Sequence, residues 1–260
     1  WRGAPAAALL VVLALVGAGL SGCSDDGDAS LLGPDRPVSL ADEQKVLDQR
    51  ADALRDGDLK AFLRTLDTSD PRLVRRQRRY FANIRQLPIE ELSYQVLKSD
   101  WPVGLRSASW GKQVALPQVR LSLQLEGFDT VPVQRVTGFA IGYRQGRPVV
   151  VSELTGAGHQ FPGSSPAPWD LVRIHVRDDL DSLQLYDSGT WSRAGDVAAT
   201  LRGAIRVVRA AVPTSWDGRA VVYVFSKPVV LNSFEGVPGG NISHLGAMTF
   251  PFFAKDTQTT

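Results

Sequence analysis

Residues 53–67, ALRDGDLKAFLRTLD, decide how the N-terminal half of the chain folds, because two helical patterns meet within them. On each side of the break at 56–58, apolar residues recur at the three- and four-residue spacing of one helix face. The DGD triplet interrupts the first pattern and caps the second helix. The two apolar stripes consist of Val46, Leu47, Ala51 and Leu54 before the break and Leu59, Phe62, Leu63 and Leu66 after it.

Start signals place the first of these helices and a third one beyond them. Ser39 is an N-cap for the first helix, with Asp42 as an acidic residue at the third helical position. Asp70 and Pro71 open a third helix, since proline is favoured in the first helical turn, and this helix continues through Arg85. We therefore expect three helices between residues 40 and 85.

After Pro88 the hydrophobic period changes from that of helices to two. The clearest example is QVRLSLQLE at 118–126, in which every second residue is apolar, as in a half-buried strand. Three helices followed by an antiparallel sheet predict an α+β domain over residues 40–154. The other expected strands cover 92–96, 131–143 and 147–154, with turns at 127–129 and 145–146.

This order of elements, and the helix-DGD-helix opening in particular, resembles the cone-shaped nuclear transport factor two-like superfamily, which includes SnoaL-like proteins. The resemblance implies a cavity between sheet and helices, which in a few relatives contains an acid-base pair. The alternative is that these side chains form plain core, since Tyr and Trp in a half-buried sheet usually do. The candidate pocket residues are Tyr80, Tyr94, Asp100, Trp101 and Trp110.

Residues 155–168 have the composition of a linker, and 169–260 predict a second, partial α/β domain. Its expected elements are strands at 171–176, 182–186 and 219–226, a glycine loop at 236–240, an apolar strand at 247–254, and a helix at 192–211. That helix is expected to bury Val197, Leu201, Ala204, Ile205 and Val208.

The second domain resembles the sheet lobe that precedes the H-E-x-x-H helix in gluzincin-like metallopeptidases of secreted actinobacterial proteins. The resemblance implies zinc in a longer product, with the catalytic helix beyond Thr260 and no cofactor in residues 1–260. The chain's own histidines, His159, His175 and His244, are too far apart in sequence for a zinc-binding helix. We expect no catalytic residue within the 260 residues.

The N-terminus has the layout of an export signal over residues 1–22. Residues 4–20 carry no charge and end in small residues, and Arg2 precedes them. Leu20-Ser21-Gly22-Cys23 resembles the lipobox of bacterial lipoproteins, which implies cleavage before Cys23, thioether lipidation of its sulfur and acylation such as palmitate. Several acyl chains together give a stable anchor. We therefore expect membrane lipid as a partner, a lipidated tether over 23–39, and a location at the outer face of the cell membrane.

Composition narrows the function classes further. Cys23 is the only cysteine, which excludes disulfides and also excludes zinc-thiolate sites and a cysteine nucleophile in the fold. The net charge of +2 gives no argument for nucleic acid as a partner, and none is expected. No nucleophile elbow, phosphate loop or dinucleotide fingerprint occurs in the sequence.

A basic run, RLVRRQRRY, places four arginines on one face of the third helix. We interpret it as a solvated face in preference to a contact with anionic lipid. These arginines are Arg72, Arg75, Arg76 and Arg79.

Two functions from different classes follow. The first is a surface lipoprotein that binds an unidentified small molecule, peptide or protein in an accessory role. The second is the N-terminal fragment of a lipoprotein zinc peptidase.

Overall fold

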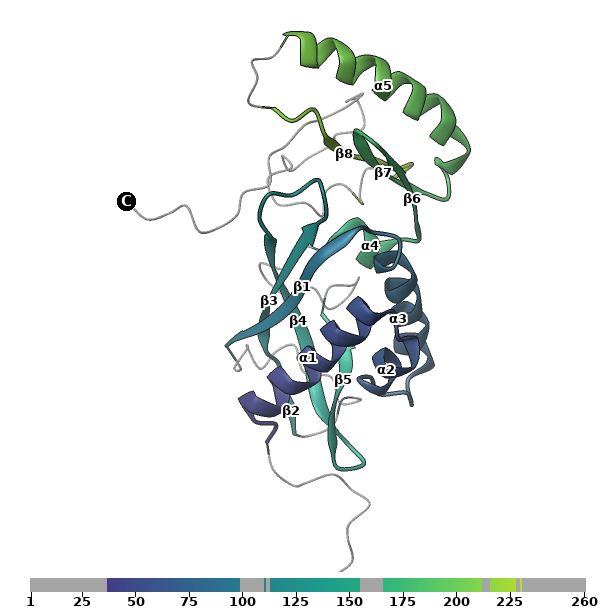
Figure 1. Ribbon diagram of the computed structural model, residues 1–260. Coiled ribbons are helices and arrows are strands. Elements are labelled where there is room, and N and C mark those ends of the chain that lie inside the picture. Colours follow the sequence, from purple (N-terminus) through teal and green to yellow (C-terminus); the bar gives the residue numbers. More distant parts are fainter. Residues whose placement is uncertain are drawn as a thin grey trace, which may run out of the picture. The chain divides into compact units, whose positions relative to one another are not determined.

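A computed structural model describes residues 37–98, 110, 113–154, 166–211, 216–227 and 230, and they form an α+β fold (Figure 1). The helices are α1 (Leu40–Asp56), α2 (Leu59–Arg64), α3 (Pro71–Ile84), α4 (Pro168–Leu171) and α5 (Ala194–Ala211), preceded by a 3-10 turn, η3 (Trp191–Arg193). The strands are β1 (Ile89–Lys98), β2 (Val114–Ala115), β3 (Gln118–Leu125), β4 (Val133–Arg144), β5 (Arg147–Glu153), β6 (Ile174–Asp179), β7 (Ser182–Asp187) and β8 (Ala220–Val224).

The helix caps lie where the sequence predicts them. The Ser39 side chain accepts from the backbone N–H of Asp42, and the Asp58 side chain accepts from that of Ala61. Gly57 ends α1 in the left-handed conformation, with φ of 70°. A glycine adopts this conformation without a steric penalty, so the chain can turn at once into α2. The three expected helices are confirmed.

The first sheet is antiparallel, with β3 between β1 and β4, while β2 and β5 both pair with β4. Along β3 the side chains alternate between half-buried and buried, which confirms the period-two prediction. Sequence periodicity did not predict β2, because two residues are too short to show a pattern.

One apolar cluster fills the space between α1–α3 and one face of this sheet. Phe139, Ile141 and Val150 point into it from β4 and β5. The intervening Ala140 and Val149 belong to a second, smaller cluster, because neighbouring side chains of a strand point to opposite faces. The far face of the first sheet is therefore apolar around β4 and β5, whereas on β3 it carries half-buried polar side chains.

The second sheet combines an antiparallel pair with a parallel one. β6 pairs antiparallel with β7, and β7 pairs parallel with β8 after the crossover through α5. The three strands and the helix occur in the expected order, although the first strand begins at Ile174 rather than at residue 171. The expected strand at 247–254 and the glycine loop at 236–240 lie outside the described residues.

The expected apolar face of α5 is only partly correct. Ile205 is buried, but Ala204 and Val208 are exposed, and Val197 and Leu201 are half-buried. The reason lies in β7: its Leu183 and Leu185 point into the large apolar cluster, whereas the alternate side chains are polar or carry a hydroxyl. A helix facing such a surface has little apolar area to cover.

Residues on both sides of the expected linker contact each other directly. The Asn83 side-chain amide of α3 donates to the carbonyls of Trp169 and Val172, and its oxygen accepts from the backbone N–H of Ile174. Ile174, Leu183 and Leu185 also belong to the same apolar cluster as α1–α3. The division into domains at 155–168 stays a prediction, but the segment after it shares a core with the segment before it.

Replacing Gly57 by alanine tests the turn between α1 and α2. A Cβ at this position would lie 2.8 Å from Cζ of Arg85, and the positive φ is strained for any L side chain. We expect Gly57→Ala to lower the free energy of unfolding by about 1 kcal/mol or more. Gly203→Ala, in an open position of α5, should instead raise it by about 0.5 kcal/mol. Urea denaturation of both variants measures this, and equal signs for the two changes would contradict it.

Candidate functional site

Two of the five expected pocket residues meet inside the large apolar cluster. The hydroxyls of Tyr80 and Tyr94 lie 3.1 Å apart in a hydrogen bond, and both side chains are buried. Burial, together with the neighbouring Tyr94, raises the pKa of Tyr80 above its ordinary value, so its hydroxyl stays protonated. Phe62 and Phe139 pack against this pair.

Of the other three pocket candidates, Trp110 alone is among the described residues, and it does not join the tyrosine pair. Trp110 is buried in the second apolar cluster with Val149 and Val151, on the opposite face of the sheet. The sheet therefore separates Trp110 from Tyr80 and Tyr94, because neighbouring side chains of a strand point to opposite faces. Asp100 and Trp101 lie outside the described residues.

The centre of the cluster is a buried cation, Arg50. Its side chain is 2% exposed, and its guanidinium carbon lies 4.3 Å from the ring centre of Phe62 and 5.3 Å from that of Tyr80. A guanidinium over aromatic faces is attracted by the ring quadrupoles, and the attraction grows when water is excluded. One nitrogen, Nη2, donates to the side-chain oxygen of Gln77, whereas Nε and Nη1 have no hydrogen-bond partner in the described part of the chain.

A carboxyl group completes this polar centre. Glu153, at the end of β5, accepts from Gln77 through one oxygen and from Nε of Arg76, at 3.0 Å, through the other. Burial raises the pKa of Glu153, and the positive charge of Arg50 only partly offsets the effect. Arg50, Gln77 and Glu153 thus form a chain of contacts from α1 through α3 to β5, the "polar centre".

A second buried ion pair lies beside the polar centre. Arg135 of β4 donates to Asp170 of α4 at 2.9 Å, and its guanidinium lies 5.4 Å from the ring centre of Trp169. The same Asp170 oxygen accepts from the backbone N–H of Ala167. The side chain of Asp170 is 9% exposed, so little water screens this pair. The Arg135–Asp170 pair fixes α4 against the first sheet.

Sequence reasoning missed the polar centre, although one signal was present. Arg50 sits inside the apolar stripe of α1, between Leu47 and Leu54, where a solvated arginine is not expected. Glu153 gives no such signal, because a polar residue at a strand end is ordinary. Only the packing of β5 against α3 brings its carboxyl to Gln77.

The polar centre has the groups of an acid-base site but is enclosed by side chains. A general acid or base must come within hydrogen-bond reach of its substrate, and aromatic rings surround Arg50. Two hollows among the described residues lie at the surface around α2, with volumes of about 490 and 440 Å³. Their linings include none of the three residues of the polar centre.

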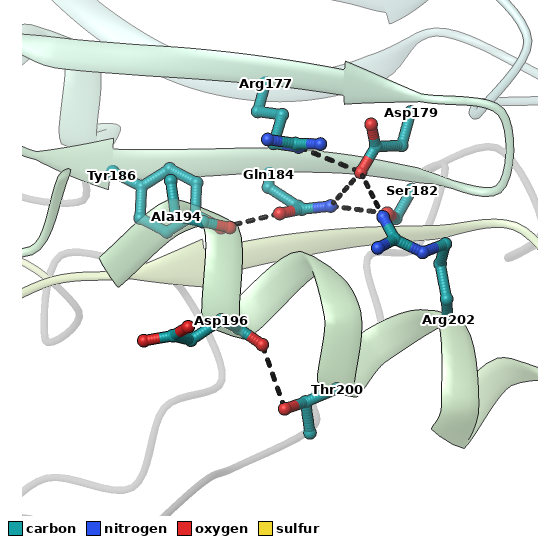
Figure 2. A network of polar contacts seen from close by, with 9 residues as sticks. All are labelled: Arg177, Asp179, Ser182, Gln184, Tyr186, Ala194, Asp196, Thr200 and Arg202. Carbon is teal, nitrogen blue, oxygen red and sulfur yellow. Dashed lines mark hydrogen bonds and ion pairs between the residues drawn. The ribbon is translucent and has the colours of Figure 1, made fainter. Parts of the chain in front are cut away.

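The second sheet has a polar network of its own, shown in Figure 2. Asp179 accepts from Nε of Arg177 and from the side-chain amide of Gln184, both at 3.0 Å, and lies 3.8 Å from Nη1 of Arg202 on α5. The Tyr186 hydroxyl donates to the side-chain oxygen of Gln184 at 2.5 Å. These contacts satisfy the polar side of β7 that faces α5, which is a structural role.

The described residues contain no group of three His, Cys, Asp or Glu side chains that could hold a metal ion. His175, the one histidine among them, contacts the Ser188 hydroxyl at 3.2 Å and stacks on Trp191. These residues do not fit a zinc site. His159 and His244 lie outside the described residues.

Comparison with known proteins adds no relative: no family model, no curated protein and no solved structure matches the chain. Among the described helices, none is both long and apolar enough to cross a membrane. Residues 4–20 are not among them.

Removing the charge of Asp170 tests the buried pair. Asp170→Asn removes the buried carboxylate that accepts from Arg135, and we expect a loss of about 3 kcal/mol in the free energy of unfolding. Asp179→Asn, the control, removes a carboxylate that is 22% exposed and should cost less than about 1 kcal/mol. Urea denaturation of the full chain compares them, and equal losses would contradict the assigned role.

Glu153→Gln tests the raised pKa of the buried carboxyl. A raised pKa in the folded state means that Glu153 contributes stability below the pKa of the unfolded chain, which is lost as pH rises through the folded pKa. The wild type should therefore lose stability relative to Glu153→Gln as the pH rises above the ordinary range of a glutamate pKa. Urea midpoints from that range upward measure the difference, and a constant or opposite trend would contradict it.

Proposed function

We propose that this chain is an exported lipoprotein, held at the outer face of the cell membrane through Cys23, with a noncatalytic binding or accessory role. The observation that carries the proposal is Leu20-Ser21-Gly22-Cys23 at the end of the uncharged segment 4–20. An acidic, glycine-containing stretch follows Cys23, which is the composition of a tether and not of a core. The cysteine is thus an attachment point.

The described fold supports a binding role over a catalytic one. Glu153, one of two described carboxyl groups with a raised pKa, is held by Gln77 and Arg76, and the surrounding space is filled. We also propose the finer fold class, a cone-type domain over 40–154. Its support is the order of three helices and an antiparallel sheet whose helix-facing side lines one apolar cluster.

A second candidate function is the N-terminal part of a zinc peptidase. The observation that favours it is the order β6, β7, α5 and β8, which agrees with the expected sheet lobe. Zinc ligands would come from residues after Thr260, so sequencing the gene beyond codon 260 tests it. A stop codon directly after Thr260 would rule this candidate out.

Lipidation is tested by expressing the full chain, with a start codon added, in bacteria fed an alkyne analogue of palmitate. We expect the wild type to incorporate the label and Cys23→Ala to lose it, because the sulfur is the site of attachment. Ser24→Ala is the matched control and should keep the label. The proposal fails if Cys23→Ala is labelled at the wild-type level.

A further inference from the structure

Of the four arginines expected on one face of α3, two contact other elements of the fold and two are exposed. Arg76 binds Glu153, and Arg79 donates to the backbone carbonyl of Asp170 at 3.2 Å. Both therefore stabilise the fold. Arg72 and Arg75 are exposed, as the interpretation of a solvated face requires. Arg76 and Arg79 are half-buried, so the solvated part of this face consists of Arg72 and Arg75.

A different set of cations gathers around the hollow of about 490 Å³ beside α2. Four exposed basic side chains line it, and they come from α2, α3 and the start of β5. No acidic side chain lines this hollow, and none of the four cations makes an ion pair within the described residues. We call it the basic hollow; its lining consists of Leu59, Lys60, Leu63, Arg64, Thr68, Arg78 and Arg147.

The stability of the fold explains the arrangement only in part: Arg64 lies in the last turn of α2, where a cation is favourable, but the other three cations have no such role. Lys60 and Arg64 are four residues apart on α2, and like charges at this spacing destabilise a helix by roughly 0.2–0.5 kcal/mol. Arg78 and Arg147 add two more positive charges without a carboxylate in the lining. Such a site is complementary to an anion, and arginine is suited to phosphate because its planar guanidinium can donate two parallel hydrogen bonds.

We infer that the basic hollow binds the phosphate headgroups of anionic lipids in the membrane that carries the Cys23 anchor. The inference rests on the proposed function, since an anchored chain has such headgroups within reach. The half-buried Leu59 and Leu63 give the hollow an apolar part next to its cations, which suits a headgroup with its glycerol backbone. Basic residues close to an anionic surface each contribute to binding.

The charges beyond the hollow limit where a membrane can lie. The neighbouring hollow shares Arg64 and Arg147 but is also lined by Asp52, Asp56 and Asp58. These carboxylates repel anionic headgroups, so the contact is confined to the α2–α3 side of Arg64.

Vesicle flotation tests the inference independently of lipidation. The probe is the full chain with Cys23→Ser, added to vesicles of phosphatidylcholine alone or mixed equally with phosphatidylglycerol. Residues 4–20 contribute apolar binding to both kinds of vesicle, so the ratio of the two partition coefficients isolates the headgroup term. We expect Arg64→Gln with Arg78→Gln to lower this ratio by about 25-fold, roughly fivefold per cation, at low salt.

The matched control removes two exposed cations elsewhere, Arg193→Gln with Arg206→Gln, at the end of η3 and on α5. It should leave the ratio nearly unchanged. An equal fall in both double variants would overturn the inference, because net charge alone would then explain binding. It would also be overturned if inorganic phosphate, or a phosphopeptide, bound to the hollow while phosphatidylglycerol gave no preference.

The two proposals can fail separately. If the palmitate label is absent but the preference for phosphatidylglycerol depends on Arg64 and Arg78, the anchor is wrong and the basic hollow stands. If the label is present and the preference is absent, the anchor stands and the basic hollow does not bind headgroups.

Discussion

The fold around α1–α3 depends on how it accommodates one buried guanidinium. Arg50 lies among aromatic rings, with Gln77 as its hydrogen-bond partner and Glu153 beyond it. Moving a charge out of water costs several kcal/mol unless partners surround it. The aromatic faces and the polar centre together offset that cost only if α1, α3 and β5 hold their positions. The buried arginine therefore constrains the relative positions of α1, α3 and β5, which an aliphatic residue would not do.

Side chains of α3 also link the two sheets. α3 carries Gln77 toward the first sheet and Asn83 toward the segment that leads into the second. Asn83 satisfies three backbone groups where the chain leaves α4, and the Arg135–Asp170 pair fixes α4 from the other side. β7 then divides its side chains between the shared core and the polar network facing α5. Because the side of β7 that faces α5 is polar, few side chains of α5 are buried.

Charge placement separates the cations that contact acceptors of the fold from the cations of the basic hollow. Arginines with carboxylate or carbonyl partners, such as Arg76 and Arg79, belong to the fold. Those around the basic hollow have no acidic neighbour in its lining, although α2 would be more stable with one. A chain that is anchored by lipid gains from such a surface, since the anchor and the headgroup contact act on the same membrane.

The sequence by itself determined the elements: the three N-terminal helices with their caps, the alternating strand β3 and the order of elements after residue 168. These follow from local spacing, since the periods of helix and strand appear directly in the chain. It also contains Leu20-Ser21-Gly22-Cys23, whose resemblance to a lipobox stays a prediction. Tertiary structure alone decided that Glu153 meets Gln77, that Trp110 lies on the far face of the sheet, and that Lys60, Arg78 and Arg147 share one hollow. Periodicity assigns a side chain to a face of its own element, but it does not say which other element that face will meet.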